Sequence, residues 1–156
     1  MKTIIIDNFL SQVECHDLIN FYRENEKFAK KFRDVYPLQL FPKDPKINYL
    51  KLKLNKISKD FNAEIDWFEI VKWPIGSKQN LHFDLAKNET VLSSIVYLND
   101  DFEGGQTYFE EGTTFKPKTG RGLFFDGQYY KHGVRTVEGN IRYVVAAWYK
   151  KLYPIS

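Results

Sequence analysis

The chain has 156 residues, enough for one domain with a single hydrophobic core and too few for two domains of ordinary size. Aromatic residues make up 17% of it, which excludes an intrinsically disordered chain, and its net charge of +3 is too small and too dispersed to indicate a nucleic-acid-binding patch. One cysteine, Cys15, excludes an internal disulfide, and we find neither a signal peptide nor a membrane-spanning run. These features predict one soluble domain in the cytoplasm.

The N-terminal part is predicted to contain a short strand at residues 4–6 and then a helix. Ser11 and Glu14 match a capping box, and apolar residues follow at helical spacing, which predicts an amphipathic helix over about 12–26. Residues 33–45 contain three prolines and are predicted to form a loop, which is also a candidate lid for a substrate site.

A second helix is predicted to begin at Asp44-Pro45, because proline suits the first helical position. Its buried face is marked by apolar residues three or four apart: Ile47, Leu50, Leu54, Ile57 and Phe61. We therefore expect residues 11–62 to form a helical support for the rest of the domain.

From residue 65 onward the pattern changes to short strands separated by glycine-rich turns. The predicted strands are residues 65–73, 91–98, 107–109, 123–125 and 143–149. Many short strands without intervening helices are typical of a β-sandwich or jelly roll. We predict a mainly β (α+β) fold in a single domain, residues 1–156, with a jelly-roll core at about 65–150 braced by the N-terminal helices.

Two histidines and one aspartate form a candidate metal site. His82 and Asp84 are two residues apart, so on an extended segment their side chains leave the same face, and His132 must come from another strand. Two imidazoles and one carboxylate are the facial triad of non-heme Fe(II) oxygenases. The alternative is that His82 and His132 are unrelated, half-buried histidines.

Several further motifs surround these residues. They are His82-Phe83-Asp84, Tyr97-Leu98-Asn99-Asp100, Glu103-Gly104-Gly105-Gln106-Thr107, residues 117–125, His132-Gly133-Val134, Gly139-Asn140-Ile141-Arg142 and Trp148. Together with an N-terminal pattern at residues 6–19, they resemble the 2-oxoglutarate- and Fe(II)-dependent dioxygenases, specifically the prolyl 4-hydroxylase-like branch. The resemblance covers most of the chain.

The resemblance implies a double-stranded β-helix that holds Fe(II) at His82, Asp84 and His132. It also implies 2-oxoglutarate as cosubstrate, with its distal carboxylate on Arg142, O2 as oxidant and ascorbate as reductant. Arg142 lies in an apolar strand, where an unpaired cation is costly and a bound dicarboxylate removes that cost. A simple surface ion pair is the alternative for Arg142.

The resemblance also places residues around the cosubstrate and the substrate. Tyr97 is expected to reach the distal carboxylate, and strand alternation puts Ile95 on the same face as Tyr97. Thr107 and Trp148 match positions that line the active site, with ordinary packing as the alternative for each. The resemblance assigns Thr107 to 2-oxoglutarate with Arg142 and Tyr97, and it assigns Trp148, Trp73 and Ile95 to the substrate pocket. The position nine before the first histidine ligand, commonly tyrosine in prolyl hydroxylases, is Trp73 here. This departure affects contacts on that side of the site.

The implied reaction is hydroxylation of a C–H bond with release of succinate and CO2. The carboxylate of Asp84 favours hydroxylation, since related halogenases carry a small residue there.

A peptidyl-proline or another protein side chain is the first choice of substrate by resemblance, and a free amino acid or small metabolite is the alternative. An AlkB-type nucleic-acid demethylase is disfavoured, because Trp148 stands where that family has a second arginine. A non-catalytic 2-oxoglutarate or metal sensor is the rival function. The sequence indicates no membrane partner and no particular oligomeric state.

Overall fold

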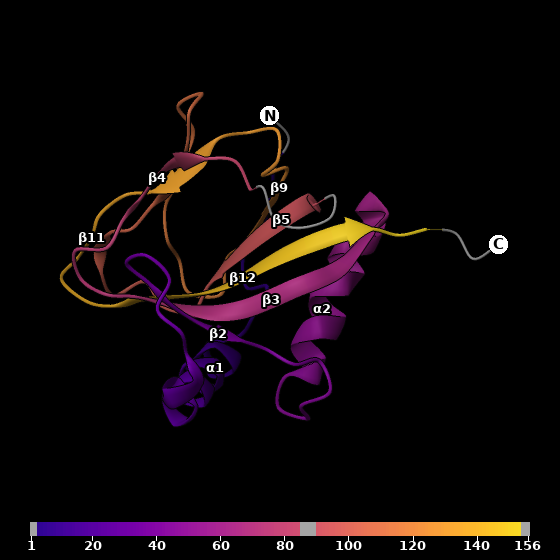
Figure 1. Cartoon of the computed structure of the whole chain (residues 1–156), viewed down its shortest axis with the longest axis horizontal. Coiled ribbons are helices and arrows are strands. Elements are labelled where there is room, and N and C mark those ends of the chain that lie inside the picture. The colour runs from indigo at the N-terminus through magenta and orange to yellow at the C-terminus, as the bar shows by residue number, and fades with distance from the viewer. Residues whose placement is uncertain (1–2, 85–89, 154–156) are drawn as a thin grey trace.

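Two antiparallel β-sheets face each other, and helices cover the outer side of the larger sheet (Figure 1). The computed structural model describes residues 3–84 and 90–153. Its helices are α1 (Gln12–Glu24) and α2 (Asn48–Ser58), each followed by a short 3-10 turn, η1 (Glu26–Phe28) and η2 (Lys59–Phe61). Among the described residues, no helix is both long and apolar enough to cross a membrane.

The larger sheet has six strands in the order β1-β9-β5-β12-β3-β2. In that order they span Ile4–Ile6, Gly122–Phe125, Thr90–Tyr97, Arg142–Lys151, Ala63–Trp73 and Tyr36–Gln39. Within this sheet only β2 and β3 are neighbours that also follow each other along the chain. The last strand, β12, pairs with β3 on one side and with β5 on the other. It therefore joins the two halves of the sheet.

The smaller sheet has four strands in the order β4-β10-β7-β8. They span Gln79–His82, His132–Val134, Thr107–Phe109 and Thr114–Phe115. Two further short strands, β6 (Glu103–Gly104) and β11 (Val137–Glu138), pair with each other. The two antiparallel sheets confirm the predicted mainly β, jelly-roll class.

Each face of the larger sheet has its own apolar core. On the outer face, Leu18 of α1 and Leu50 of α2 pack with sheet residues such as Val145. On the inner face, Val71 and Val144 pack with residues of the smaller sheet. The helices thus brace the outside of the sheet, as predicted, while the inner face is free to hold a site between the two sheets.

The N-terminal predictions are confirmed in part. The capping box of α1 is present, with Glu14 N–H donating to Ser11 Oγ at 3.1 Å and Ser11 N–H donating to Glu14 Oε1 at 2.9 Å. The second helix was predicted to have Pro45 as its first residue, but α2 begins three residues later, at Asn48. A separate turn precedes α2, in which the Asp44 carbonyl accepts hydrogen bonds from the N–H groups of Ile47 and Asn48. The predicted loop at 33–45 contains strand β2, whose Pro37 is tolerated because the strand lies at the sheet edge.

Candidate active site

The two candidate histidine ligands face each other across neighbouring strands. His82 is the last residue of β4 and His132 the first of β10, and the register of these antiparallel strands pairs the two directly. Their ring centroids lie 4.4 Å apart. The β4 and β10 pairing, which the sequence pattern did not reveal, therefore brings together residues fifty positions apart.

Asp84 completes the group from the segment just beyond β4. Its Oδ1 lies 3.4 Å from His82 Nε2 and 3.2 Å from His132 Nε2. One ligand atom from each of the three side chains can be chosen so that all lie within 4.8 Å of one another. These residues are thus close enough to share one metal ion, and the interpretation of two unrelated histidines is not supported.

Hydrogen bonds hold both imidazoles in the state that a metal requires. His82 Nδ1 lies 2.9 Å from the Asn80 carbonyl oxygen, and His132 Nδ1 lies 3.0 Å from the Tyr130 carbonyl oxygen. A carbonyl accepts but cannot donate, so each Nδ1 carries the proton in the neutral ring. Both Nε2 atoms are directed toward Asp84. A proton on Nε2 donates to the carboxylate, and its loss leaves a lone pair for a metal, as in metal sites whose outer hydrogen bonds orient the ligands.

Asp84 is also held in place from behind. Ser93 Oγ donates to Asp84 Oδ2 at 2.7 Å, which leaves Oδ1 facing the imidazoles. Burial opposes a charge on this carboxyl, but hydrogen bonds from the two histidines and Ser93 outweigh it and hold the pKa of Asp84 well below its usual range. The carboxyl is therefore ionised at neutral pH and able to bind a cation.

A second polar cluster lies deeper between the sheets. Arg142, the first residue of β12, is fully buried. Its Nη2 lies 3.4 Å from Thr107 Oγ1, and the hydroxyl groups of Tyr97 and Thr107 are 2.6 Å apart. The three residues that the resemblance assigns to 2-oxoglutarate are thus in one cluster. The surface ion pair weighed as the alternative for Arg142 is excluded by this burial.

The guanidinium of Arg142 is poorly compensated. Its Nε and Nη1 have no hydrogen-bond partner, and its CZ atom lies 4.8 Å from the Trp73 ring and 5.3 Å from the Tyr97 ring. Burial lowers the pKa of Arg142 from its ordinary value, with the Tyr97 hydroxyl opposing that shift. Two unpaired donors on a buried cation suit a carboxylate as their acceptor.

Trp73 is the departure from the tyrosine common in prolyl hydroxylases. The indole is buried, its ring packs against the Arg142 guanidinium, and its Nε1 has no hydrogen-bond partner. Trp73 therefore contributes a flat aromatic wall to the arginine, and its N–H is a further donor available to an oxygen.

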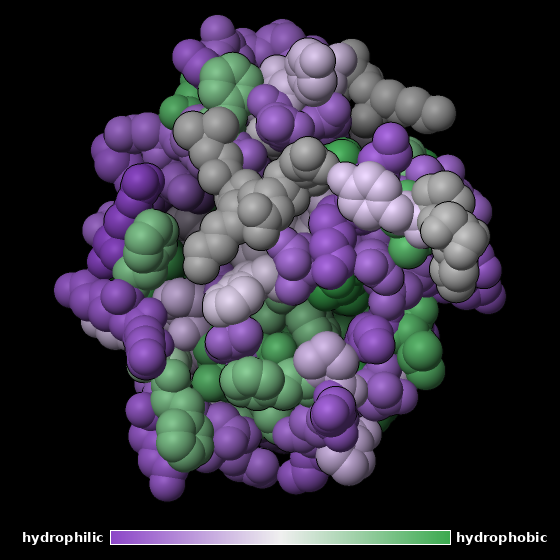
Figure 2. Space-filling view, turned by 45° about the vertical axis from the view of Figure 1, so that its right-hand side comes forward, coloured by the Kyte–Doolittle hydropathy of each residue, from purple (hydrophilic) through white to green (hydrophobic). Residues whose placement is uncertain are grey.

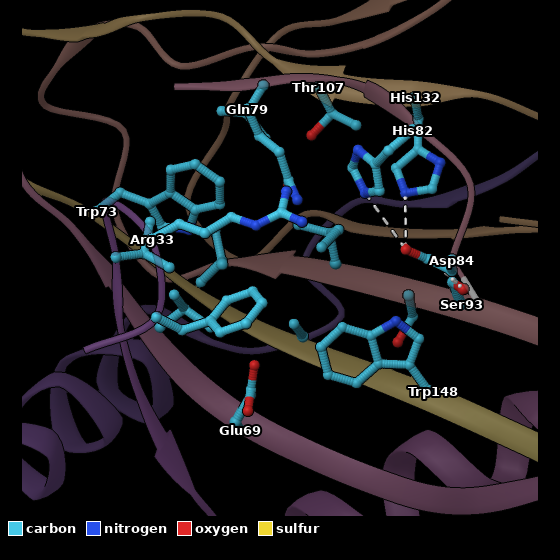
Figure 3. A pocket seen from close by; sticks show the side chains of 18 of the residues that line it. Arg33, Glu69, Trp73, Gln79, His82, Asp84, Ser93, Thr107, His132 and Trp148 are labelled. Atoms are coloured by element: carbon cyan, nitrogen blue, oxygen red, sulfur yellow. Dashed lines mark hydrogen bonds and ion pairs between the residues drawn. The ribbon is translucent and has the colours of Figure 1, made fainter. Parts of the chain in front are cut away.

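A cavity of about 150 Å³ joins these parts (Figure 3). Its wall includes all three candidate metal ligands as well as Thr107, Trp73, Ile95 and Trp148, whereas Arg142 lies just behind the wall. Trp148, which is half-buried, lies beside Asp84 and Ser93 in this view. The predicted site residues thus line or adjoin one space, and its other lining residues are about equally apolar and polar.

Sequence reasoning missed three features of this cavity. Ser93 supports Asp84, and its position two residues before Ile95 on β5 was the available signal. Glu69 of β3 faces the cavity, and Phe32–Val35 reaches its rim from the N-terminal part, with Arg33 extending across the space (Figure 3). The candidate lid at 33–45 therefore contributes only its first residues, because the next ones form β2.

The family is shown by sequence comparison. The profile described as "2OG-Fe(II) oxygenase superfamily" matches residues 68–150, more than half of the chain. Prolyl 3-hydroxylase 2 of Homo sapiens is 41% identical over 64 residues, which cover 36% of this chain and 9% of that protein. A putative prolyl 4-hydroxylase of Acanthamoeba polyphaga mimivirus is 22% identical over 148 residues, which cover 80% of this chain and 60% of that protein. The chain thus spans less than two thirds of the length of these curated relatives.

Solved structures show the same fold. The viral collagen prolyl hydroxylase vCPH of Paramecium Bursaria Chlorella virus-1, solved as a 2OG complex, has a TM-score of 0.81 and 22% identity, with 98% of this chain and 97% of that chain covered. A Pseudomonas putida prolyl-4-hydroxylase has a TM-score of 0.80 and 17% identity, with 97% and 93% covered. The profile match and these neighbours agree with the geometry of the site: the chain belongs to the 2OG-Fe(II) oxygenase superfamily.

Proposed function

We propose that this protein is an Fe(II)- and 2-oxoglutarate-dependent hydroxylase that acts on a C–H bond of a peptidyl side chain, with proline as the first candidate. The observation that carries the proposal is one cavity flanked by two unlike sites. One offers two imidazole nitrogens and a carboxylate oxygen, and the other offers a buried guanidinium with two unpartnered N–H groups. The first suits a divalent metal and the second suits the far end of a dicarboxylate.

The donor set fits Fe(II). His82, Asp84 and His132 would hold the ion through Nε2, Oδ1 and Nε2, and three ligands leave open positions for cosubstrate and oxygen. With 2-oxoglutarate and O2, bound iron supplies the oxidising power for C–H hydroxylation, with succinate and CO2 as the expected co-products. The role of the protein is to position the reactants and to keep water out.

The arginine cluster fits the distal carboxylate of 2-oxoglutarate. Arg142 would donate from its free N–H groups, and Tyr97 and Thr107 would donate from their hydroxyls after the 2.6 Å bond between them rearranges. The Trp73 and Tyr97 rings hold the guanidinium plane in place before ligand arrives. This preorganisation lowers the cost of binding, because the fork needs no reorientation.

The apolar wall of the cavity would shelter the reaction and orient the substrate. Ile95 and Trp148 both line the cavity, and Trp148 lies near Asp84 (Figure 3). The indole of Trp148 offers a flat surface for a ring or aliphatic side chain. Excluding water strengthens the polar interactions inside the cavity and limits side reactions. We therefore assign Ile95 and Trp148 to the substrate side of the site.

The choice of a peptide substrate rests on relatives. The proteins named above are prolyl hydroxylases, and a Trichoplax adhaerens prolyl hydroxylase of the same fold, with a TM-score of 0.79 and 18% identity, was solved with a peptide fragment of the hypoxia inducible factor oxygen degradation domain. A small-metabolite substrate, ascorbate as reductant and a cytoplasmic location stay predictions.

The test is turnover of 2-oxoglutarate by the purified protein with Fe(II), ascorbate and O2. We expect succinate release that stops with His82→Ala, and a +16 Da product by mass spectrometry when a proline-containing peptide library is supplied. The exposed His16 provides the control, since His16→Ala should leave turnover unchanged. A protein that binds 2-oxoglutarate and Fe(II) but releases no succinate with any peptide or metabolite would be a sensor, contrary to the proposal.

A further inference from the structure

Glu69 is a carboxylate in the cavity that the proposed chemistry does not use. It lies in β3 on the inner face of the larger sheet, together with Trp67, Val71 and Trp73 at alternate positions. Its carboxylate points into the cavity from the end opposite the two histidines (Figure 3). The proposed chemistry gives this carboxylate no role, so its position in the cavity needs a physical explanation.

Within the part of the chain that the structure describes, Glu69 has no cationic partner. Its one hydrogen bond comes from Trp67 Nε1, at 3.0 Å from Oε2, and no ion pair within 4.0 Å involves it. The cavity also contains two basic side chains, Arg33 and Lys78, but neither pairs with Glu69. Burial raises the pKa of the Glu69 carboxyl, and the Trp67 hydrogen bond only partly offsets this. A cation brought by a ligand would relieve that cost.

Two tryptophans flank this carboxylate. The register of β3 and β12 pairs Trp67 directly with Trp148, and pairs Glu69 with Ala146, whose small side chain leaves the carboxylate accessible. Trp67 is 43% exposed and Trp148 is half-buried, so both rings are open to a ligand. A carboxylate beside aromatic rings is a good receptor for an ammonium or guanidinium group, through a charged hydrogen bond and cation–π attraction.

Glu69 also stands where the cavity meets a second hollow. That hollow extends from Trp67 and Glu69 along edge strand β2 toward Phe28 and Phe41. Both phenylalanines are more than 60% exposed. Figure 2 shows apolar side chains toward the middle of one face of the molecule, framed by hydrophilic ones. A ligand that extends past Glu69 thus has further surface to contact, which favours a chain molecule over a compact metabolite.

We infer that Glu69, between Trp67 and Trp148, binds a cationic group of the substrate, and that this group is a lysine or arginine side chain close to the hydroxylated residue of a peptide. The inference rests on the proposed function and extends it, because it names the substrate class. A small amine would have the same chemistry at Glu69 but would leave the second hollow unused.

The first test measures selection from a randomised heptapeptide library by the Fe(II)- and 2-oxoglutarate-loaded protein under nitrogen. Wild type should retain peptides enriched in lysine and arginine, Glu69→Gln should lose the enrichment, and Glu69→Lys should retain acidic peptides instead. For a selected lysine peptide, Glu69→Gln should weaken binding about tenfold, equivalent to about 1.4 kcal/mol. The glutamine side chain keeps an oxygen for the Trp67 N–H, so the fold should be preserved; Glu64→Gln on the same strand, outside the cavity, is the matched control.

The second arm separates a peptide from a small amine. Thermal unfolding is followed with free L-lysine and with norleucine, its neutral analogue. Stabilisation by lysine alone that disappears in Glu69→Gln, without peptide selection, supports the cation site and assigns a small-molecule source. Equal peptide compositions for wild type and Glu69→Lys, together with no lysine effect, overturn the inference. Succinate release is measured in parallel, with and without the selected peptides. If it persists while both arms fail, only the inference is lost, and if it is absent even with the selected peptides, the proposed hydroxylase function fails.

Discussion

Replacing Arg142 with methionine should stabilise the protein when 2-oxoglutarate is absent. The guanidinium is fully buried with two unpartnered N–H groups, so it is a charge without a counter-ion. Exchanging buried ionic groups for apolar ones of similar volume yields up to about 4 kcal/mol. The rings of Trp73 and Tyr97 offset about 2 kcal/mol of that through cation–π attraction. The expected net gain for Arg142→Met is therefore about 2 kcal/mol.

Adding the dicarboxylate should reverse this order. At a concentration one hundred times its Kd, 2-oxoglutarate should stabilise the wild type by about 2.7 kcal/mol and the methionine variant not at all. At roughly 2–4 °C per kcal/mol for a domain of this size, the variant should melt about 4–8 °C above wild type alone and at or slightly below it with 2-oxoglutarate.

The assay is thermal unfolding by circular dichroism with Fe(II) under nitrogen, with and without 2-oxoglutarate. Arg135→Met is the control, because Arg135 is exposed and stacks on Tyr108 with its CZ atom 4.4 Å from the ring centroid. Its substitution should change stability by no more than about 1 kcal/mol, the contribution of an exposed cation–π contact, and equally in both conditions. A methionine variant at position 142 that melts well below wild type without 2-oxoglutarate, or gains as much from it, would refute the reasoning.

Three other predictions concern the metal site and the core. His82→Ala should lower Fe(II) affinity at least about 100-fold by isothermal titration while the far-ultraviolet spectrum is retained, because the residue is a candidate ligand at a strand end; unchanged affinity would contradict the ligand set. Gly127→Ala should lower Fe(II) affinity about 10- to 100-fold in the same titration without removing a ligand, because the added Cβ would collide with the Asp84 carboxylate. Full affinity in this variant would show that the Asp84 carboxylate is not held against Gly127. Burial raises the pKa of the Cys15 thiol to about 11 from 9.0, so folding favours the neutral form: stability should be unaffected below about pH 9 and fall as pH rises toward 11. Iodoacetamide at pH 8.5 should accordingly alkylate Cys15 on the order of 100-fold more slowly in native than in unfolded protein, by mass spectrometry, and equal rates would contradict its burial.

The metal ligands were predictable because chemistry restricts their residue types. A site with two imidazoles and one carboxylate has few candidates in a chain with three histidines. The strands around it were harder to find: β4 and β10 are only four and three residues long, which is too short for a hydrophobic period to mark them. Their pairing depends on contacts between distant segments, which a local pattern does not contain.

Other parts of the site were hidden for different reasons. Glu69 shares a strand face with Trp67 and Val71, but the opposite face is also apolar, so alternation alone does not show which face lines a cavity. The prolines near Tyr36–Gln39 indicate a loop, yet an edge strand accepts Pro37 because its outer N–H positions are not needed for the ladder. In both cases the tertiary neighbours decide the outcome, and the sequence alone does not name them.

The position of β12 in the larger sheet has a consequence for synthesis of the chain. Of the described strands, this one is the last to leave the ribosome, yet it lies between β3 and β5 and contributes Arg142 to the cluster with Tyr97 and Thr107. Until it emerges, no backbone hydrogen bonds join the two halves of the sheet, and each half exposes an unpaired apolar edge. We expect a nascent chain that ends before residue 142 to be sensitive to protease, and the domain to reach its native structure only after translation of this final strand.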